Sequence, residues 1–181
     1  MRGRSFLIAS FSLLAAASPS LAQSPARVPI PYTSYIAINP LGIPFNIAAA
    51  ELESGVANGI TVGGVASYTA LSHDRYTTVD LKVRYYPSEV VLEGLSFGVS
   101  LGRTHFTTLV DTGFGGAVRR GKDYTSFGLL GDYNWLLGAR KRFVVGTGVG
   151  LKRVFLSSDE RSTFGIDQPV FTARFVLGLA F

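Results

Sequence analysis

Hydrophobic and polar positions alternate along the final segment of the chain, 171–181. Its odd-numbered positions are all apolar, whereas its even-numbered positions are small or polar, with Arg174 near the middle. A period of two residues is the pattern of a β-strand whose two faces meet different surroundings. The segment therefore predicts a strand with one wholly apolar face.

The same alternation recurs upstream, in 95–102 and 145–151, where large apolar residues alternate with glycine and serine. The outer face of a soluble β-sandwich usually carries Lys, Glu and Thr instead. Small residues suit the crowded interior of a narrow barrel, and large apolar residues suit a face turned toward lipid. The pattern favours a membrane barrel; a soluble sandwich or lipocalin-like barrel is the alternative.

Alternating segments predict an all-β fold, an antiparallel up-and-down transmembrane β-barrel of eight strands. The first segment is the weakest, and we include it because a barrel with both termini on one side needs an even number of strands. The predicted strands are 32–39, 44–53, 59–70, 75–86, 94–107, 122–135, 142–155 and 169–181.

The lengths of the connections predict an orientation. If the C-terminus is periplasmic, the connections near 54–58, 87–93 and 136–141 are short periplasmic turns. The external connections are then 71–74, 108–121 and 156–168, of which the last two are long. We expect 108–121 to be a glycine-rich, mobile loop.

The N-terminal segment predicts export. Arg2 and Arg4 precede an apolar run at 6–17, and a small-x-small triplet, Ser20-Leu21-Ala22, follows Pro19. A basic start, a short apolar core and a small-residue cleavage site characterise a secretory signal peptide. The predicted organisation is a signal peptide at 1–22 and an outer-membrane β-barrel domain at 23–181.

Composition excludes several classes of protein. The chain has no cysteine, which rules out disulfides, thiol catalysis and zinc–thiolate sites. Mean hydropathy is high, at +0.30, but the most apolar later stretch, 28–50, contains four prolines that disfavour a spanning helix. The net charge of +5, smaller without Arg2 and Arg4, is too weak to indicate nucleic-acid binding. No motif indicates a cofactor or a metal.

Charged residues recur on the small faces of the strands, and we predict that they form a network inside the barrel. Buried charges are costly unless paired, and an eight-stranded barrel is just wide enough for side chains to fill it. The predicted network is therefore a charge-paired plug, with a conducting path as the alternative. It consists of Glu51, Glu53, Asp80, Lys82, Arg84, Asp132, Lys152 and Arg174.

Aromatic residues near the strand ends predict belts at the two membrane interfaces. We place Tyr85, Tyr133 and Trp135 at the periplasmic rim and Phe106 at the outer rim. Tyr86 is placed beside Tyr85, although its parity points inward and leaves ordinary packing open.

The end of the chain resembles a known assembly signal. A terminal aromatic residue preceded by apolar residues at every second position is similar to the last strand of bacterial outer-membrane proteins. With the signal peptide and the alternating strands, the whole mature chain resembles the small eight-stranded families typified by the OmpA transmembrane domain and OmpX. The resemblance implies recognition of the last strand by the barrel-assembly machinery, through Phe175, Leu177, Leu179 and Phe181.

A second group of charges has lipid-facing parity or lies in the expected outer loop. Guanidinium and ammonium groups at this level suit lipid phosphates of the outer leaflet, with ordinary solvated rim charge as the alternative. The candidate lipopolysaccharide contacts are Arg103, His105, Arg119, Arg120, Lys122 and Arg153.

His105 also raises an enzymatic alternative. Small outer-membrane enzymes that modify lipid A use a histidine with a serine partner and an acid. Here Thr107 and Thr108 follow where those deacylases carry serine and asparagine, and the acid is unassigned. We therefore predict a non-enzymatic, structural or surface-interaction protein, with a deacylase-like enzyme as the alternative. Its expected partners are outer-membrane lipid and the assembly machinery, and the oligomeric state is left open.

Deleting Phe181 tests the assembly signal. We expect the deletion to lower the amount of folded barrel in the outer membrane, because the terminal strand loses its last outward aromatic. Quantitative blotting of outer-membrane fractions measures this, with Phe171→Ala as a control at the other end of the segment. A wild-type yield from the deletion variant would contradict the assignment.

Overall fold

The computed structural model describes residues 32–72, 74–111, 117–155 and 169–181. The predicted signal peptide at 1–22, the connection 156–168 and the centre of the 108–121 connection lie outside these residues. Within the described chain, no helix is long and apolar enough to cross a membrane.

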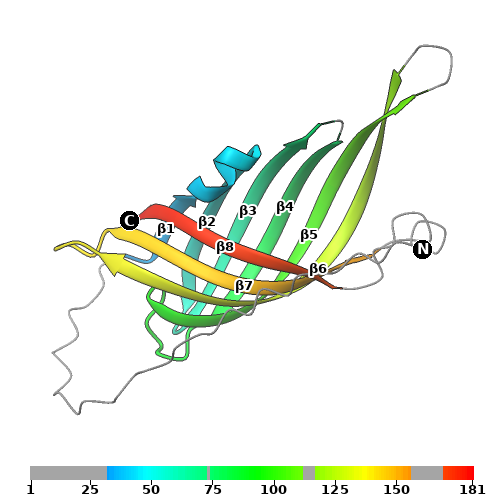
Figure 1. Cartoon of the computed structure of the whole chain (residues 1–181). Coiled ribbons are helices and arrows are strands. Elements are labelled where there is room, and N and C mark those ends of the chain that lie inside the picture. Colours follow the sequence, from blue (N-terminus) through cyan, green and yellow to red (C-terminus); the bar gives the residue numbers. More distant parts are fainter. Residues whose placement is uncertain (1–31, 73, 112–116, 156–168) are drawn as a thin grey trace, which may run out of the picture.

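Eight strands close into one ring, as the alternation predicts (Figure 1). Each strand pairs antiparallel with its neighbours in sequence, and β8 closes the ring by pairing with β1. The elements are β1 (Ser34–Ile38), η1 (Pro40–Phe45), β2 (Ile47–Ala57), β3 (Ile60–Leu71), β4 (Asp74–Tyr85), β5 (Gly94–Asp111), β6 (Ala117–Leu137), β7 (Phe143–Phe155) and β8 (Val170–Ala180).

The two ends of the barrel differ. Short turns join β2 to β3, β4 to β5 and β6 to β7 at one end, where the C-terminus also lies (Figure 1). We call this the turn end. At the opposite end β5 and β6 project beyond the other strands (Figure 1), and we call it the hairpin end.

The barrel is apolar outside and polar inside. On β4, Val79 and Leu81 are more than half exposed, whereas Arg84 and the facing Glu53 of β2 are 1% exposed. This is the reverse of a soluble protein, in which large apolar side chains fill the interior. Strand alternation produces it because successive side chains point to opposite faces of the sheet.

The start of the barrel differs from the prediction. β1 is five residues long, shorter than the predicted 32–39. Residues 40–45 form a short 3-10 helix, η1, which replaces the predicted connection and the first two residues of the predicted strand 44–53. The side-chain oxygen of Asn39 accepts the backbone N–H groups of Leu41 and Gly42 and thereby caps η1. Pro40 and Pro44 lack the N–H that a strand ladder needs, so strand pairing resumes only at Ile47.

The connection between β5 and β6 is also different. Strand pairing continues past the predicted ends, from Thr108 opposite Arg120 to Asp111 opposite Ala117. The described ends of the expected glycine-rich loop, 108–111 and 117–121, are therefore paired strands. The glycine content of the segment suggested a loop, but its β-branched residues, such as Thr108 and Val118, also favour a strand.

Candidate functional site in the barrel interior

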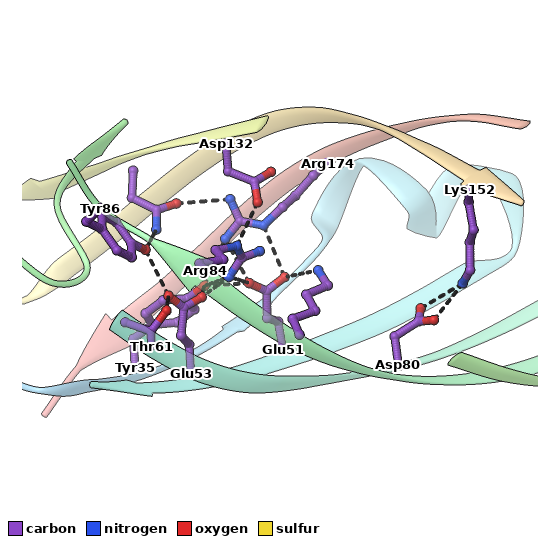
Figure 2. Close-up of polar contacts among 12 residues, drawn as sticks. Tyr35, Glu51, Glu53, Thr61, Asp80, Arg84, Tyr86, Asp132, Lys152 and Arg174 are labelled. Carbon is purple, nitrogen blue, oxygen red and sulfur yellow. Dashed lines mark hydrogen bonds and ion pairs between the residues drawn. The ribbon is translucent and has the colours of Figure 1, made fainter. Parts of the chain in front are cut away.

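Arg84 lies at the centre of the charged interior. Its guanidinium Nε contacts Asp132 Oδ2 at 2.7 Å, and its Nη1 contacts Glu51 Oε1 at 3.0 Å and also pairs with Glu53 (Figure 2). Asp132 comes from β6 and the glutamates from β2, so one side chain of β4 joins carboxylates from non-neighbouring strands. These contacts cross the inside of the ring.

Glu51 binds two further cations. Arg174 of β8 donates from Nε and Nη2 to the two Glu51 oxygens at 3.1 and 2.9 Å. Lys82 Nζ lies 3.3 Å from Glu51 Oε2. Glu51 therefore carries three cationic partners, and paired, charge-assisted hydrogen bonds are the condition under which buried ions are tolerated.

Four uncharged side chains complete this network, and the sequence analysis did not assign them to it. Tyr35 Oη lies 2.8 Å from Glu53 Oε2 and accepts from Arg174 Nη2 at 2.9 Å. Thr61 and Tyr86 each donate to Glu53 Oε1, at 2.6 and 2.8 Å (Figure 2). Asn134 donates to Tyr86 Oη and accepts from Arg174 Nη1. Inward parity is the sequence signal that they share.

Tyr86 and Phe106 therefore do not form part of the aromatic belts. Tyr86 is fully buried, and Phe106 shares the inward parity of Gly102 on β5 and packs against Tyr76, with ring centroids 4.8 Å apart. Tyr85, Tyr133 and Trp135 are exposed on the outer surface, where a belt residue belongs.

A second, smaller pair lies nearer the hairpin end. Lys152 Nζ of β7 lies 2.6 and 2.9 Å from the two carboxylate oxygens of Asp80 on β4 (Figure 2). A cavity of about 260 Å³ lies between this pair and the Glu51–Arg174 contact, and its lining includes Ser67 and Thr78. We call this cavity the cup.

Glycines opposite the charges make room for them. A Cβ at Gly98 would lie 2.6 Å from the Val83 carbonyl oxygen and 2.9 Å from Arg84 Cγ. A Cβ at Gly102 would overlap the Asp80 carboxylate. Small residues on the inner faces of the strands thus leave space, and charged side chains from neighbouring strands occupy that space.

The structure places all eight predicted interior charges in these two groups. The smaller pair is formed by Asp80 and Lys152. The larger network contains three acids and three bases, namely Glu51, Glu53, Asp132, Lys82, Arg84 and Arg174. Each group is electrically balanced. Among the described residues, no group of three or more His, Asp or Glu side chains could hold a metal ion.

The candidate lipid-phosphate residues lie on the projecting strands and β7. Arg103 and His105 of β5 both contact Asp123 of β6, at 2.9 and 2.8 Å, on the exposed outer face. Arg119, Arg120, Lys122 and Arg153 are exposed, and the first three lie in β6 instead of a loop. Asp123 was missed by the sequence analysis because its partners lie on another strand.

The contact with Asp123 gives His105 an acidic partner. A carboxylate on the Nδ1 side orients an imidazole, as a general base requires. Thr107 shares the outward parity of His105, and no described contact links the two. An exposed rim ion pair has the same geometry, so the pair does not by itself indicate catalysis.

The predicted assembly residues lie on the strand that closes the ring. Leu177 and Leu179 are opposite Ile38 and Ile36 of β1, and their side chains are exposed. The backbone N–H of Phe181 donates to Ser34 O at 2.8 Å. The last residues of the chain therefore form the contact that closes the barrel.

Comparisons with solved structures show the same fold. The chain is similar to the N-terminal β-barrel domain of Pseudomonas aeruginosa OprF, with a TM-score of 0.50 and 11% identity, over 83% of this chain and 98% of that one. It is also similar to the Yersinia pestis outer membrane protein Ail, with a TM-score of 0.49 and 16% identity, over 83% of this chain and 99% of that one. No family model and no curated protein sequence matches the chain. The fold is that of the OprF N-terminal β-barrel domain.

Replacing Arg84 with methionine tests the network. We expect the free energy of unfolding to fall by about 3–5 kcal/mol, because three buried carboxylates lose a shared partner. Lys152→Met, at the more exposed pair, should cost about 1 kcal/mol. Urea unfolding of the refolded barrel in detergent measures both.

A second substitution separates charge from packing. Adding Glu53→Gln to Arg84→Met should restore part of the lost stability, because one unpaired charge is removed. Equal losses for Arg84→Met and Lys152→Met, with no restoration by Glu53→Gln, would show that the network does not stabilise the barrel.

Proposed function

We propose that this chain is an exported integral protein of the bacterial outer membrane, with a charge-plugged barrel and a structural or surface-interaction role that involves no catalysis. The observation that carries the proposal is the reversed distribution of side chains, in which balanced ions fill the interior and large apolar residues are exposed. Water does not stabilise such an exterior, whereas a bilayer does.

The outer surface supports insertion in a bilayer. Val79, Leu81, Phe97, Leu101 and Leu129 form part of an exposed apolar band around the ring, and each is at least half exposed. Where the strands pair around the ring, they satisfy backbone groups that lipid cannot. The tilted rings of Tyr133 and Trp135 lie in contact near the turn end, with centroids 4.6 Å apart, and aromatic residues are expected in a belt at the membrane interface.

The interior supports a plug. At the level of Arg84, hydrogen bonds and ion pairs connect side chains from β1, β2, β3, β4, β6 and β8 (Figure 2). An ion crossing the barrel would have to displace these contacts. The proposal is therefore a barrel that does not conduct and that presents its projecting β5–β6 hairpin outside the cell.

The two ends of the chain supply the route to the membrane. Under the proposal, 1–22 directs export and is removed, and the assembly machinery binds the last strand through its outward apolar residues. The same strand, β8, then completes the ring by pairing with β1. Under the proposal, recognition of β8 and closure of the barrel are therefore a single event.

Localisation and conductance test the proposal together. We expect the chain in outer-membrane fractions, with faster migration on SDS gels before boiling than after it. In planar bilayers the wild-type barrel should show no conductance steps, whereas Glu51→Ala combined with Arg174→Ala should show them. Arg103→Gln with Asp123→Asn is the control, since it removes a pair outside the plug. Conductance of the wild type, or sedimentation with soluble proteins, would overturn the proposal.

We also propose that the outward cations bind lipopolysaccharide phosphates. Arg103 is 72% exposed on its side chain, and Arg153 is exposed on β7, so both can reach a lipid head group. Adding lipopolysaccharide to bilayers should raise the midpoint of thermal unfolding by about 2–4 °C, the shift expected for about 1 kcal/mol. The double variant Arg103→Gln, Arg153→Gln should lose this rise. Lys141→Gln, at the turn end, should keep it, and an equal rise in all three would contradict the contact.

A further inference from the structure

On one side of the closed ring, β1 is shorter than the strands beside it. β1 pairs with β8 only from Leu177 to Ala180, and with β2 only from Ala50 to Ser54. Beyond β1, 170–176 of β8 and 47–49 of β2 continue toward the hairpin end, and no described strand lies between them. We call this gap the seam.

The seam lies at membrane depth. A strand needs about 9–11 residues to cross a bilayer, and β1 has five. η1 takes its place, packs against both β2 and β8, and exposes Leu41, Ile43 and Phe45, each by more than half. Gly42 permits the close packing, because a Cβ there would lie 2.6 Å from the carbonyl oxygen of Ile47.

The seam leaves a strand edge without a strand partner. Phe181 and Ser34 exchange both backbone hydrogen bonds, so the same parity directs the N–H and C=O groups of Phe175, Ala173 and Phe171 toward the seam. Within hydrocarbon, such backbone is tolerated only where it lines protein or a hydrated cavity. The polar interior must therefore reach the seam.

The cup provides that polar surface. Its lining combines inward residues such as Lys152 and Asp80 with Ala50 and Ala173, which have outward parity and flank the seam. Ala50 also lines a separate apolar groove of about 320 Å³ on the outer surface, together with Ile36, Leu52, Gly64 and Ala66. The polar cup and the apolar groove share Ala50, Glu51 and Val65, and Ala50 lies opposite Ile38, where β1 ends and the seam begins.

We propose that the seam is a lateral binding site for a monoacyl lipid with a zwitterionic head group, an inference that rests on the proposed membrane location. The acyl chain lies in the outer groove, and the head group enters the cup beside η1. The cup contains both signs of charge, in Lys152 and Arg174 and in Asp80 and Glu51. The phosphate of the lipid head group would bind the two cations, and the ammonium group of the same head group would bind the two carboxylates. The net charge of the interior would then stay balanced.

The number of chains follows from the shape of the site. The groove is one shallow channel between Leu52 and Val79, floored by Gly64 and Ala66. One acyl chain fits a single channel, and the residues that line the groove form no second channel for the other chain of a diacyl lipid. The site therefore selects by chain number as well as by head group.

Spin-labelled lipids in nanodiscs test the site. The wild-type barrel, in a diacyl phosphatidylcholine nanodisc, should restrict the motion of a spin-labelled monoacyl phosphatidylethanolamine about fivefold more strongly than that of spin-labelled phosphatidylcholine, measured as relative association constants. Gly64→Leu should abolish this preference by filling the groove. Gly131→Leu is the matched control, because Gly131 also faces outward and a Cβ there meets nothing within 4 Å.

A second variant tests the head group. Asp80→Asn with Lys152→Gln keeps the size and net charge of the cup but removes its ion pair, and it should reduce the preference to near that of a monoacyl alcohol probe. Heat-dependent migration on SDS gels confirms that each variant is folded.

The outcomes are distinguishable. If the wild-type barrel restricts both lipid probes equally, the lateral site is wrong. The same follows if Gly64→Leu keeps the preference, and in both cases the membrane location stands. If neither probe is restricted, the barrel does not contact lipid, and the proposed function fails together with the site.

Discussion

The pairing of buried ions inside a narrow barrel is the constraint on which the rest of the structure depends. Arg84 shares three carboxylates from two strands, and each contact fixes the register of the strands that carry it. A shift of one residue would turn these charges toward the outer face. The glycines of the inner faces follow from the same constraint, because a Cβ at Gly98 would collide with the Arg84 side chain. Charge pairing thus accounts for both the strand register and the placement of glycine on the inner faces.

One side of the barrel wall differs from the rest, because β1 is shorter than its neighbours. Pro40 and Pro44 end strand pairing early, and η1 lies where a longer first strand would continue toward the hairpin end. Neighbouring β2 and β8 keep their length because β3 and β7 still pair with them. The lining of the cup therefore includes outward-facing Ala50 and Ala173 where the wall lacks a strand, and η1 packs beside β2 and β8 there.

Much of the interior was predictable because parity reports on it directly. Arg84 and Arg174 stand on small faces of strongly alternating segments, and both lie in the central network. Tyr35, Thr61 and Asn134 were not predicted as members, since an inward Tyr, Thr or Asn carries no charge that demands a partner. Asp123 was missed for another reason: its contacts with Arg103 and His105 join two strands, and pairing across strands depends on a register that alternation does not provide.

The sequence by itself determined which side of each strand faces outward, because that choice depends only on local alternation and on the polarity of each side chain. It also determined that the interior charges had to balance. Only the tertiary structure decided which acid meets which base, where the hairpin of β5 and β6 ends, and that η1 stands in place of a strand. These features depend on the closure of the ring, which sets distances between residues far apart in the chain, such as Glu51 and Arg174.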